Sequence, residues 1–430
     1  MTHDAAIPPG LEPVRSTVEQ RGIYYSAAQW TPLELASLAQ QLKTKGRDAL
    51  VEISNQTLLD AWCDTVEAFR DPLSPERKAL DPSLTRLCQL SIPGLQAGLE
   101  AVLGGVTRQP AQQLQAQAKD WQARGPEVSL VLVALAANLP ALAVQPLLPA
   151  LLLRQPVILK SASREPLFAP AFVRALIQRL PDLGAAMAAI TWKGGDPALE
   201  APLLEAADLV LAYGEAEALA DLKQRAPGRV FGYGPKTSLA VVAAEVAPEA
   251  TAAGLARDIA LFDQRGCLSI QAIFTAGDAA RLATLVIDEL ETLAKEWPPG
   301  ELDAVAAAGV QQVRSDALLR GLFLPQSPLA AGTVVVEPEL RFQPSPGLRT
   351  VRVHPIQDLS GLPELLIDWS GQLQGAALAG EAAWQLQPKL QELGMSHFAP
   401  PGLLQTPDAS WHNGGVHPLA VLTGSAMGDA

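Results

Sequence analysis

One cysteine of the chain stands where a sulfur nucleophile could work. Cys267 lies in the stretch FDQRGCLS, after a polar and charged loop and before a run typical of a strand. Buried structural cysteines usually lie within apolar strands or helices, whereas Cys267 follows a flexible, charged loop. On chemistry alone, a catalytic cysteine and an inert one are therefore about equally expected here. Gly266 would let a substrate carbonyl approach closely, and Arg265 could favour the thiolate. Spacing alone selects no general base.

Other candidate residues have simpler interpretations when they are taken alone. Asn138 precedes Leu-Pro and is typical of a turn, and Lys160 would be the solvated end of a strand. His412 and His417 have no cysteine or carboxylate pattern near them, so we expect ordinary loop histidines and no metal site. A complete dinucleotide-binding glycine motif is absent from the sequence.

The elements that must position these residues alternate between strand and helix from Val128 onward. Short apolar runs separated by helical runs of about ten to fifteen residues predict βαβ units and a parallel sheet. We expect strands at 130–135, 157–159, 188–192, 207–212, 229–231, 239–243, 269–275, 334–336, 350–353 and 376–378. We expect helices at 165–180, 197–206, 215–225, 248–262 and 279–296. Residues 1–125 are polar and mostly helical in pattern, with apolar spacings of three and four at 30–43, 58–69 and 93–103.

Composition narrows the class of protein. A chain of 430 residues exceeds one hydrophobic core, and 48% hydrophobic residues argue against disorder. The net charge of −13 argues against a nucleic-acid partner, which needs basic stripes. Cys63, Cys88 and Cys267 show no CxxC spacing, so neither a disulfide framework nor a zinc cage is expected, and Cys63 and Cys88 fall on helical faces as inert thiols. The first residues lack the pattern of a signal peptide, and we expect a cytoplasmic protein.

One uncharged segment, 128–153, is long enough to cross a bilayer. Three prolines interrupt it, and helix interiors tolerate proline poorly. We therefore expect no transmembrane segment, but a buried strand, a turn at 137–140 and a core helix that ends near Leu153.

The cysteine loop and four further segments resemble a known family. FDQRGCLS resembles the cysteine loop of the LuxC-type fatty acyl reductases, a branch of the aldehyde dehydrogenase superfamily. In the same order, the chain contains segments similar to the superfamily's oxyanion turn and lysine strand, its glycine turn, its interdomain segment and the closing loop of the LuxC branch. These are AANLPALAVQPLLPALLLRQPVILKSA (136–162), ADLVLAYG (207–214), FGYGPKTSLAVV (231–242) and PPGLLQTPDASWHNGG (400–415). The resemblance covers roughly residues 128–420, and five motifs in order are a specific signal.

The resemblance implies an aldehyde dehydrogenase-like fold of two α/β domains, a Rossmann-like cofactor domain and a catalytic cysteine domain. We expect an N-terminal, mostly helical region at 1–125 joined to the cofactor domain, an NADP-binding domain at 126–236, a catalytic domain at 237–400 and a closing segment at 401–430. The cysteine loop would lie near the junction.

The resemblance also implies roles for single residues. Cys267 matches the thiolate that attacks the acyl carbonyl, and Asn138 matches the amide that donates to the oxyanion, together with the Cys267 N–H; such a donor supplies about 3 kcal/mol. Lys160 matches the lysine that contacts the adenosine ribose. Ser163, with Arg164 beside it, stands where NAD-preferring relatives have a glutamate, so we expect NADPH.

Two positions depart from the superfamily's pattern. Gly214 matches the glycine turn near the cofactor phosphates, but Glu215 follows it where a small hydroxyl residue is common, and a carboxylate would repel a pyrophosphate. Gly232 stands where hydrolytic relatives carry the glutamate that activates water. Without that base, an acyl-cysteine would be reduced or passed to another thiol rather than hydrolysed.

The expected function is therefore NADPH-dependent reduction of an acyl thioester, by resemblance a fatty one, to an aldehyde through an acyl-cysteine. The acyl donor would be acyl-CoA or an acyl-protein thioester, and an acyl-transferring protein partner and a homo-oligomer stay open. Two alternatives remain: a short-chain CoA-acylating aldehyde dehydrogenase, and a catalytically silent scaffold with the same fold.

Overall fold

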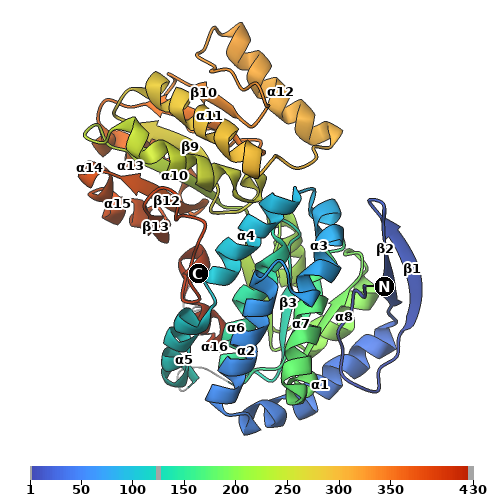
Figure 1. The fold of residues 1–430 in the computed structure, drawn as a ribbon. Coiled ribbons are helices and arrows are strands. Elements are labelled where there is room, and N and C mark those ends of the chain that lie inside the picture. Colours follow the sequence, from blue (N-terminus) through green and yellow to red (C-terminus); the bar gives the residue numbers. More distant parts are fainter. Residues whose placement is uncertain (1, 123–126, 425–430) are drawn as a thin grey trace.

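Two parallel sheets covered by helices form the framework of the molecule, and an N-terminal group of helices packs against the first sheet (Figure 1). The computed structural model describes residues 2–122 and 127–424. The expected α/β fold is confirmed. The expected boundary between residues 125 and 126 and the last part of the closing segment (425–430) lie outside the described residues, so the division into domains stays a prediction.

Within the described residues, the first sheet has five parallel strands in the order β5-β4-β3-β6-β7. The strands are β3 (Val131–Ala134), β4 (Val157–Ser161), β5 (Met187–Thr191), β6 (Leu209–Tyr213) and β7 (Arg229–Tyr233). The helices that connect them are α6 (Val144–Leu152), α7 (Phe168–Arg179), α8 (Pro197–Ala206) and α9 (Ala216–Arg225). The chain changes direction across the sheet between β3 and β6, and ligands of open α/β sheets bind at the carboxyl ends of strands at such a point.

The second sheet, in the part of the chain that the structure describes, has six parallel strands in the order β10-β11-β9-β8-β12-β13. The strands are β8 (Thr237–Val242), β9 (Ile270–Thr275), β10 (Thr333–Val336), β11 (Thr350–Pro355), β12 (Leu373–Ala379) and β13 (His397–Ala399). The helices are α10 (Pro248–Ala260), α11 (Ala279–Glu296), α12 (Ala304–Leu319), α13 (Leu362–Leu365), α14 (Glu381–Trp384) and α15 (Gln387–Glu392). The patterns did not predict α12, because its alanine-rich sequence buries little beyond Val310, Val313 and Ala317.

The prediction that residues 1–125 are mostly helical missed a hairpin. Strands β1 (Val14–Gln20) and β2 (Ile23–Gln29) pair antiparallel. The turn between them places Arg21 and Gly22 at φ values of 51° and 74°. Two-residue hairpin turns need positive φ at both central positions, and glycine adopts it without strain. The hairpin stands at the edge of the molecule beside β5 and α8 (Figure 1).

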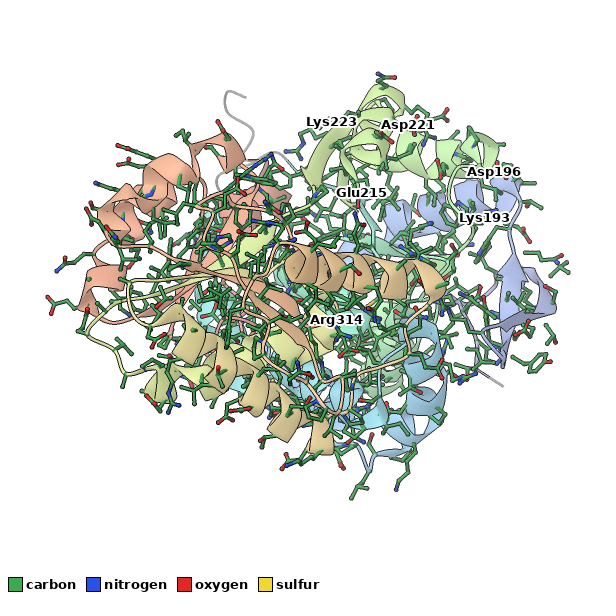
Figure 2. All side chains as sticks on the ribbon, turned by 90° about the horizontal axis from the view of Figure 1, so that it is seen from above. Lys193, Asp196, Glu215, Asp221, Lys223 and Arg314 are labelled. Atoms are coloured by element: carbon green, nitrogen blue, oxygen red, sulfur yellow. The ribbon has the colours of Figure 1, made fainter. Side chains whose placement is uncertain are left out.

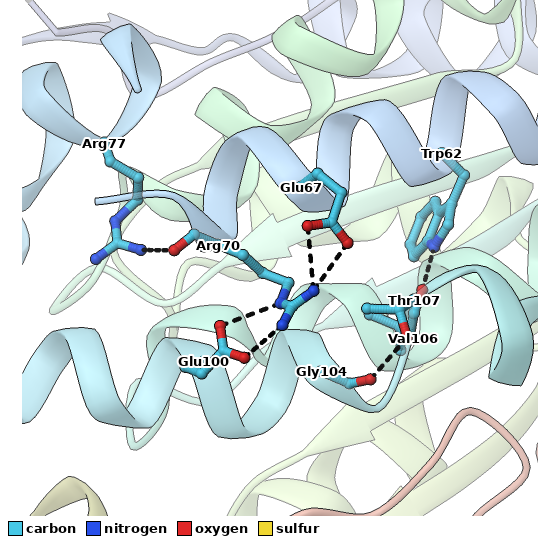
Figure 3. Close-up of polar contacts among 8 residues, drawn as sticks. All are labelled: Trp62, Glu67, Arg70, Arg77, Glu100, Gly104, Val106 and Thr107. Carbon is cyan, nitrogen blue, oxygen red and sulfur yellow. Dashed lines mark hydrogen bonds and ion pairs between the residues drawn. The ribbon is translucent and has the colours of Figure 1, made fainter. Parts of the chain in front are cut away.

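The helices expected in this region are present; the first packs with α8 on one face of the first sheet, and the others lie on the opposite side, over α6 and α7. They are α1 (Pro32–Glu52), α2 (Asn55–Arg70), α4 (Ile92–Gly104) and α5 (Arg108–Gln122), with α3 (Pro75–Cys88) in addition. Figure 3 shows how polar contacts fix α2 against α4: Arg70 binds both Glu67 and Glu100, and the Trp62 indole donates to the Val106 carbonyl at 2.9 Å. Cys63 and Cys88 lie buried in α2 and at the end of α3, where burial raises the pKa of both thiols.

Helix α4 connects this N-terminal group to the second sheet. A Cβ built on Gly98 would come 2.4 Å from the ring of Phe262, so only glycine lets the helix approach the segment before Cys267 this closely. The N-terminal helices therefore help to fix the cysteine loop.

The uncharged segment 128–153 forms β3, a 3-10 turn at Pro140–Ala143 and α6, which confirms the expected strand, turn and core helix. Its apolar residues lie in the core of the first sheet. Within residues 2–122 and 127–424, no helix is long and apolar enough to cross a membrane.

Candidate active site

The chain bends sharply just before Cys267. Helix α10 was expected to run to Phe262 but ends at Ala260, because Phe262, Asp263 and Gln264 have φ values of 52°, 49° and 65°. Each non-glycine residue in this left-handed region costs about 1–3 kcal/mol, so surrounding contacts must hold the turn.

Two side chains of the turn supply those contacts. Asp263 is buried and accepts hydrogen bonds from Arg349 Nε at 2.8 Å and from the Gly300 N–H at 2.9 Å. The Gln264 carboxamide donates to the Thr350 carbonyl and accepts from the Thr350 N–H, both at 2.7 Å. The turn is thus tied to the start of β11, next to the strand that follows the cysteine.

Cys267 lies partly buried in the turn just before β9. Its carbonyl accepts a hydrogen bond from Ser238 Oγ at 2.8 Å. Burial raises the pKa of the Cys267 thiol to about 11, while the N–H groups of Cys267 and Leu268 and the charge of Lys236 act in the opposite direction. The two N–H groups therefore face the sulfur, where charge develops when the thiolate forms or when a bound carbonyl becomes an oxyanion.

The expectation that Arg265 favours the thiolate is wrong. Its guanidinium donates hydrogen bonds to the backbone carbonyls of Cys88 and Gln89 at the end of α3, and therefore points away from the Cys267 sulfur. The cation that acts on the Cys267 thiol is Lys236, which follows β7 and lines the same cavity.

Most of the predicted site residues meet at one cavity of about 1000 Å³ between the two sheets. Its wall includes Cys267, Asn138, Ser163, Arg164 and Gly214. They come from the carboxyl ends of β3, β4 and β6 and from the turn before β9, so the edge of the first sheet faces the cysteine loop.

Asn138 lies directly over the cysteine loop. Its Nδ2 donates to the Arg265 carbonyl at 3.4 Å, and its side chain is exposed to the cavity. A donor in this position is near Cys267 and can turn toward a bound carbonyl.

Lys160 is not part of the cavity wall. Its ammonium lies over the Trp192 ring, 5.3 Å from the centroid. Burial lowers the pKa of Lys160, with Glu200 acting in the opposite direction. The lysine therefore lies at the far side of the β4 end from Cys267, toward β5 and α8.

The side of the cavity formed by the first sheet has features that the sequence patterns did not indicate. The Gln20 carboxamide donates to the Arg164 carbonyl at 3.3 Å, so the hairpin tip lies beside the loop after β4, and Arg21 lines the cavity. Neither Arg21 nor Arg164 has an ion-pair partner among the described residues. Glu215 precedes α9, is exposed and makes no capping hydrogen bond to that helix. Figure 2 labels it together with Asp221 and Lys223, which lie further along α9.

A pair of tyrosines forms the floor of the cavity. Tyr213 and Tyr233, the last residues of β6 and β7, stack with ring centroids 4.5 Å apart and an interplanar angle of 13°. Burial raises the pKa of both, so both stay phenols. Their position at the carboxyl ends of adjacent parallel strands could have identified them as site residues from the sequence, because ligands bind at such ends.

Gly232 precedes Tyr233 and faces away from the cavity. A Cβ at this position would come 3.0 Å from Leu219 Cδ1 on α9. Among the described residues, the carboxylates that line the cavity are Glu215, Glu301 and Asp303.

Behind the tyrosines lies a smaller cavity of about 40 Å³ with mostly apolar walls. It shares Tyr213, Tyr233 and Trp411 with the large cavity. Further apolar wall residues come from α4 and the residues after it, from α6, β6 and α16 (Pro418–Thr423), and from the loop before Trp411. They are Val102, Val106, Val144, Pro146, Leu148, Pro149, Leu211, Pro407, Ala409, Pro418 and Leu422.

This fold belongs to a class with solved members. The chain superimposes on an oxidoreductase from Marinobacter aquaeolei with a TM-score of 0.73 at 14% identity, covering 96% of this chain and 93% of that one. Aldehyde dehydrogenase 21 from Physcomitrella patens gives 0.69 at 13% identity, over 95% and 91% of the two chains. An NADP-dependent glyceraldehyde-3-phosphate dehydrogenase from Bacillus halodurans gives 0.64 at 17% identity, over 90% and 87%. The fold is that of the aldehyde dehydrogenases.

Within that class, the sequence identifies a family. The family model for acyl-CoA reductase (LuxC) matches residues 61–424, and the chain belongs to this family. It is 30% identical to a long-chain acyl-protein thioester reductase from Aliivibrio fischeri over 52% of this chain and 48% of the relative. The second such reductase of Photobacterium leiognathi is 26% identical over 53% and 48%. The matched part of the chain thus spans about half the length of these relatives.

Proposed function

We propose that the chain reduces acyl thioesters to aldehydes through an acyl intermediate on Cys267, with NADPH as reductant. The observation that carries the proposal is the single cavity that joins Cys267 and Asn138 to the carboxyl edge of the first sheet. Membership of the acyl-CoA reductase family supports the same reaction.

The first step is thiol exchange. The Cys267 sulfur attacks the acyl carbonyl, and a new C–S bond forms as the bond to the donor sulfur breaks. The proton that Cys267 loses when it attacks is taken up by the leaving thiolate, so the exchange is balanced in protons. Burial raises the pKa of Cys267 to about 11 and disfavours the attacking thiolate, while the N–H groups of Cys267 and Leu268 and the charge of Lys236 favour it. Asn138 Nδ2 and the Cys267 N–H would donate to the oxyanion between these two events.

The residues on the cofactor side fit a phosphorylated dinucleotide in most respects. The unpaired guanidinium of Arg164 and the hydroxyl of Ser163 suit a 2′-phosphate, while Glu215 does not suit a pyrophosphate. A bound NADPH would supply the hydride that reduces the acyl group. Lys160 would hold the adenosine ribose, Gly214 would leave room for the backbone to approach the phosphates, and Tyr213 and Tyr233 would exclude water from the reacting carbonyl.

The second step releases the product. When the acyl-cysteine carbonyl has gained a hydride, the same two N–H donors would hold the resulting oxyanion. The C–S bond then breaks, the oxygen becomes the aldehyde carbonyl, and Cys267 regains its proton. In the absence of a placed carboxylate at Gly232, water does not compete for the acyl group.

The acyl chain would enter the smaller cavity behind Tyr213 and Tyr233. Most of its wall residues are aliphatic or aromatic, with Gln145, Asp408 and Asn413 as polar members, which favours a fatty acyl group, and the names of the relatives support a long chain. The cavity of about 40 Å³ is nevertheless small, which favours the second candidate, a short-chain CoA-acylating aldehyde dehydrogenase. A series of acyl-CoA substrates of increasing chain length separates the two: kcat/KM rises with length for the first and falls for the second.

The reaction itself is tested with Cys267→Ala. This variant should lose aldehyde formation and acyl labelling, because it lacks the sulfur that carries the intermediate. Cys63→Ala is the matched control, since Cys63 is buried in α2 and should leave turnover unchanged. Turnover by Cys267→Ala would exclude the proposed mechanism, and a folded wild-type protein without labelling would favour a silent scaffold.

A further inference from the structure

The loop near the end of the chain reaches the nucleophile through a line of buried hydrogen bonds. Gln405 is 5% exposed, and its Oε1 accepts a hydrogen bond from Ser269 Oγ at 3.1 Å. The same Oγ accepts from the Gly266 N–H at 3.1 Å. Gly266 immediately precedes Cys267, so the line ends on the backbone that presents the sulfur.

The other end of the line is anchored on α10. Gln405 Nε2 donates to the Asp258 carbonyl, and the Asp258 carboxylate accepts from the Gly402 N–H at 2.7 Å. A Cβ on Gly254 would come 2.5 Å from the Pro401 carbonyl oxygen, so the loop packs on the helix backbone to backbone. Both ends of the Gln405 carboxamide are engaged, and its orientation is fixed.

These hydrogen bonds determine which backbone N–H groups of the cysteine loop are free to donate to an oxyanion at Cys267. The Gly266 N–H is engaged by Ser269, and the Cys267 carbonyl is engaged by Ser238. The N–H of Cys267 acts on its own sulfur and would be available to a carbonyl that binds there. If Gln405 is removed, the Ser269 hydroxyl can rotate and the peptide between residues 266 and 267 can tilt, which moves this N–H.

We propose that Gln405 is a positioning residue for Cys267 and acts through Ser269 and Gly266. This rests on the proposed function, in which Cys267 is the nucleophile. A displacement of about 1 Å at a reacting group can lower a rate by about 100-fold, so the effect should be measurable without loss of the fold. Nothing in the sequence spacing links these residues; the fold brings them together.

The test compares Gln405→Leu with Gln155→Leu in the full chain. Gln155 is also buried, and its Nε2 donates to the Leu422 carbonyl at 3.1 Å, so it ties the same end of the chain without touching the cysteine loop. The first readout is the pH profile of Cys267 alkylation by iodoacetamide, followed on its peptide by mass spectrometry. The second is kcat and KM with acyl-CoA and NADPH.

We expect Gln405→Leu to shift the alkylation profile and to lower kcat by about 100-fold, with KM for NADPH unchanged. Gln155→Leu should match the wild type in both. Ser269→Ala should reproduce the effect, and the double variant should be no slower than the slower single variant, because the two act on one line. If Gln405→Leu does not fold, Ser269→Ala alone decides.

A folded Gln405→Leu protein with a wild-type alkylation profile would overturn the proposal, and so would an equal effect of Gln155→Leu. Alkylation needs no acyl substrate. A shifted profile in a protein that forms no acyl adduct would therefore sustain the positioning role while removing the proposed function.

Discussion

At the scale of single residues, the chemistry depends on what surrounds the Cys267 sulfur. The loop position and the family resemblance both pointed to this cysteine. Sequence spacing could not show that the left-handed turn at 262–264 sends Arg265 toward α3, because the backbone direction decides where a side chain points. Ser269 and Gln405 could not be linked either, since they lie on different elements and meet only in the folded chain.

Lys236 should therefore control the thiol, and Arg265 should not. Lys236→Met removes the cation that opposes burial, so the pKa of Cys267 should rise further and alkylation near pH 8 should slow roughly two- to tenfold. Arg265→Met is the matched control and should leave the profile unchanged. The rate of Cys267 alkylation against pH measures both variants. Equal effects, or an effect of Arg265→Met alone, would support the sequence-based expectation that Arg265 favours the thiolate.

Cofactor choice is also a property of a few side chains. With Ser163 and Arg164 at the cavity wall, NADPH should give a higher kcat/KM than NADH. Ser163→Glu should reduce or reverse that ratio by roughly tenfold, because a carboxylate repels the 2′-phosphate and binds free ribose hydroxyls. Steady-state kinetics with both cofactors provide the measurement. A wild type that prefers NADH would show that Ser163 has been misinterpreted.

At the scale of elements, the buried parallel strands were predictable because each is a short, continuous apolar run. The hairpin β1–β2 was not, because β1 is largely exposed and mostly polar, and β2 buries only Tyr25, Ser26 and Ala28. Helix α12 lacked a clear apolar face for a similar reason. The sequence patterns thus predicted the elements that are buried in the core and missed the more exposed elements at the edges of the molecule.

Docking of the C-terminal loop on α10 should depend on pH through Asp258. Burial raises the pKa of this carboxyl to about 7 in the folded chain, above its usual range. The folded state therefore holds the proton more tightly, so the contribution of Asp258 to stability is full below its ordinary pKa of 3.8 and is lost as pH rises through about 7. Asp258→Asn keeps an acceptor for Gly402 but cannot ionise, so it should lose less stability than the wild type between about pH 5 and pH 8. Urea unfolding at these two pH values tests this, and equal losses in both proteins would contradict it.

At the scale of the whole molecule, the carboxyl edge of the first sheet and the amino-terminal ends of β8, β9 and β11 in the second sheet face one cavity. This arrangement brings the Cys267 thiol and the proposed cofactor surface together. The order of the motifs along the chain predicted this arrangement. The closeness of the contacts between the parts was not predictable, because Gly98 against Phe262 or Gly254 against Pro401 are backbone approaches between segments distant in sequence.

The arrangement predicts a stable acyl-enzyme. Without reductant, the thioester on Cys267 should outlast a catalytic turnover many-fold, because the carboxylate of hydrolytic relatives is replaced by Gly232. Gly232→Glu should not restore hydrolysis efficiently, since its Cβ would point at Leu219 rather than into the cavity. Release of free acid over time measures both proteins. Hydrolysis in the wild type as fast as reduction would mean that another group, such as Glu215 or Glu301, activates water.

The most direct test of the central claim is mass spectrometry of the wild-type protein after acyl-CoA, before and after NADPH. We predict one acyl adduct on the Cys267 peptide and its discharge as an equal amount of aldehyde when NADPH is added. An adduct on another residue, or aldehyde formed while Cys267 stays unmodified and alkylatable, would contradict it.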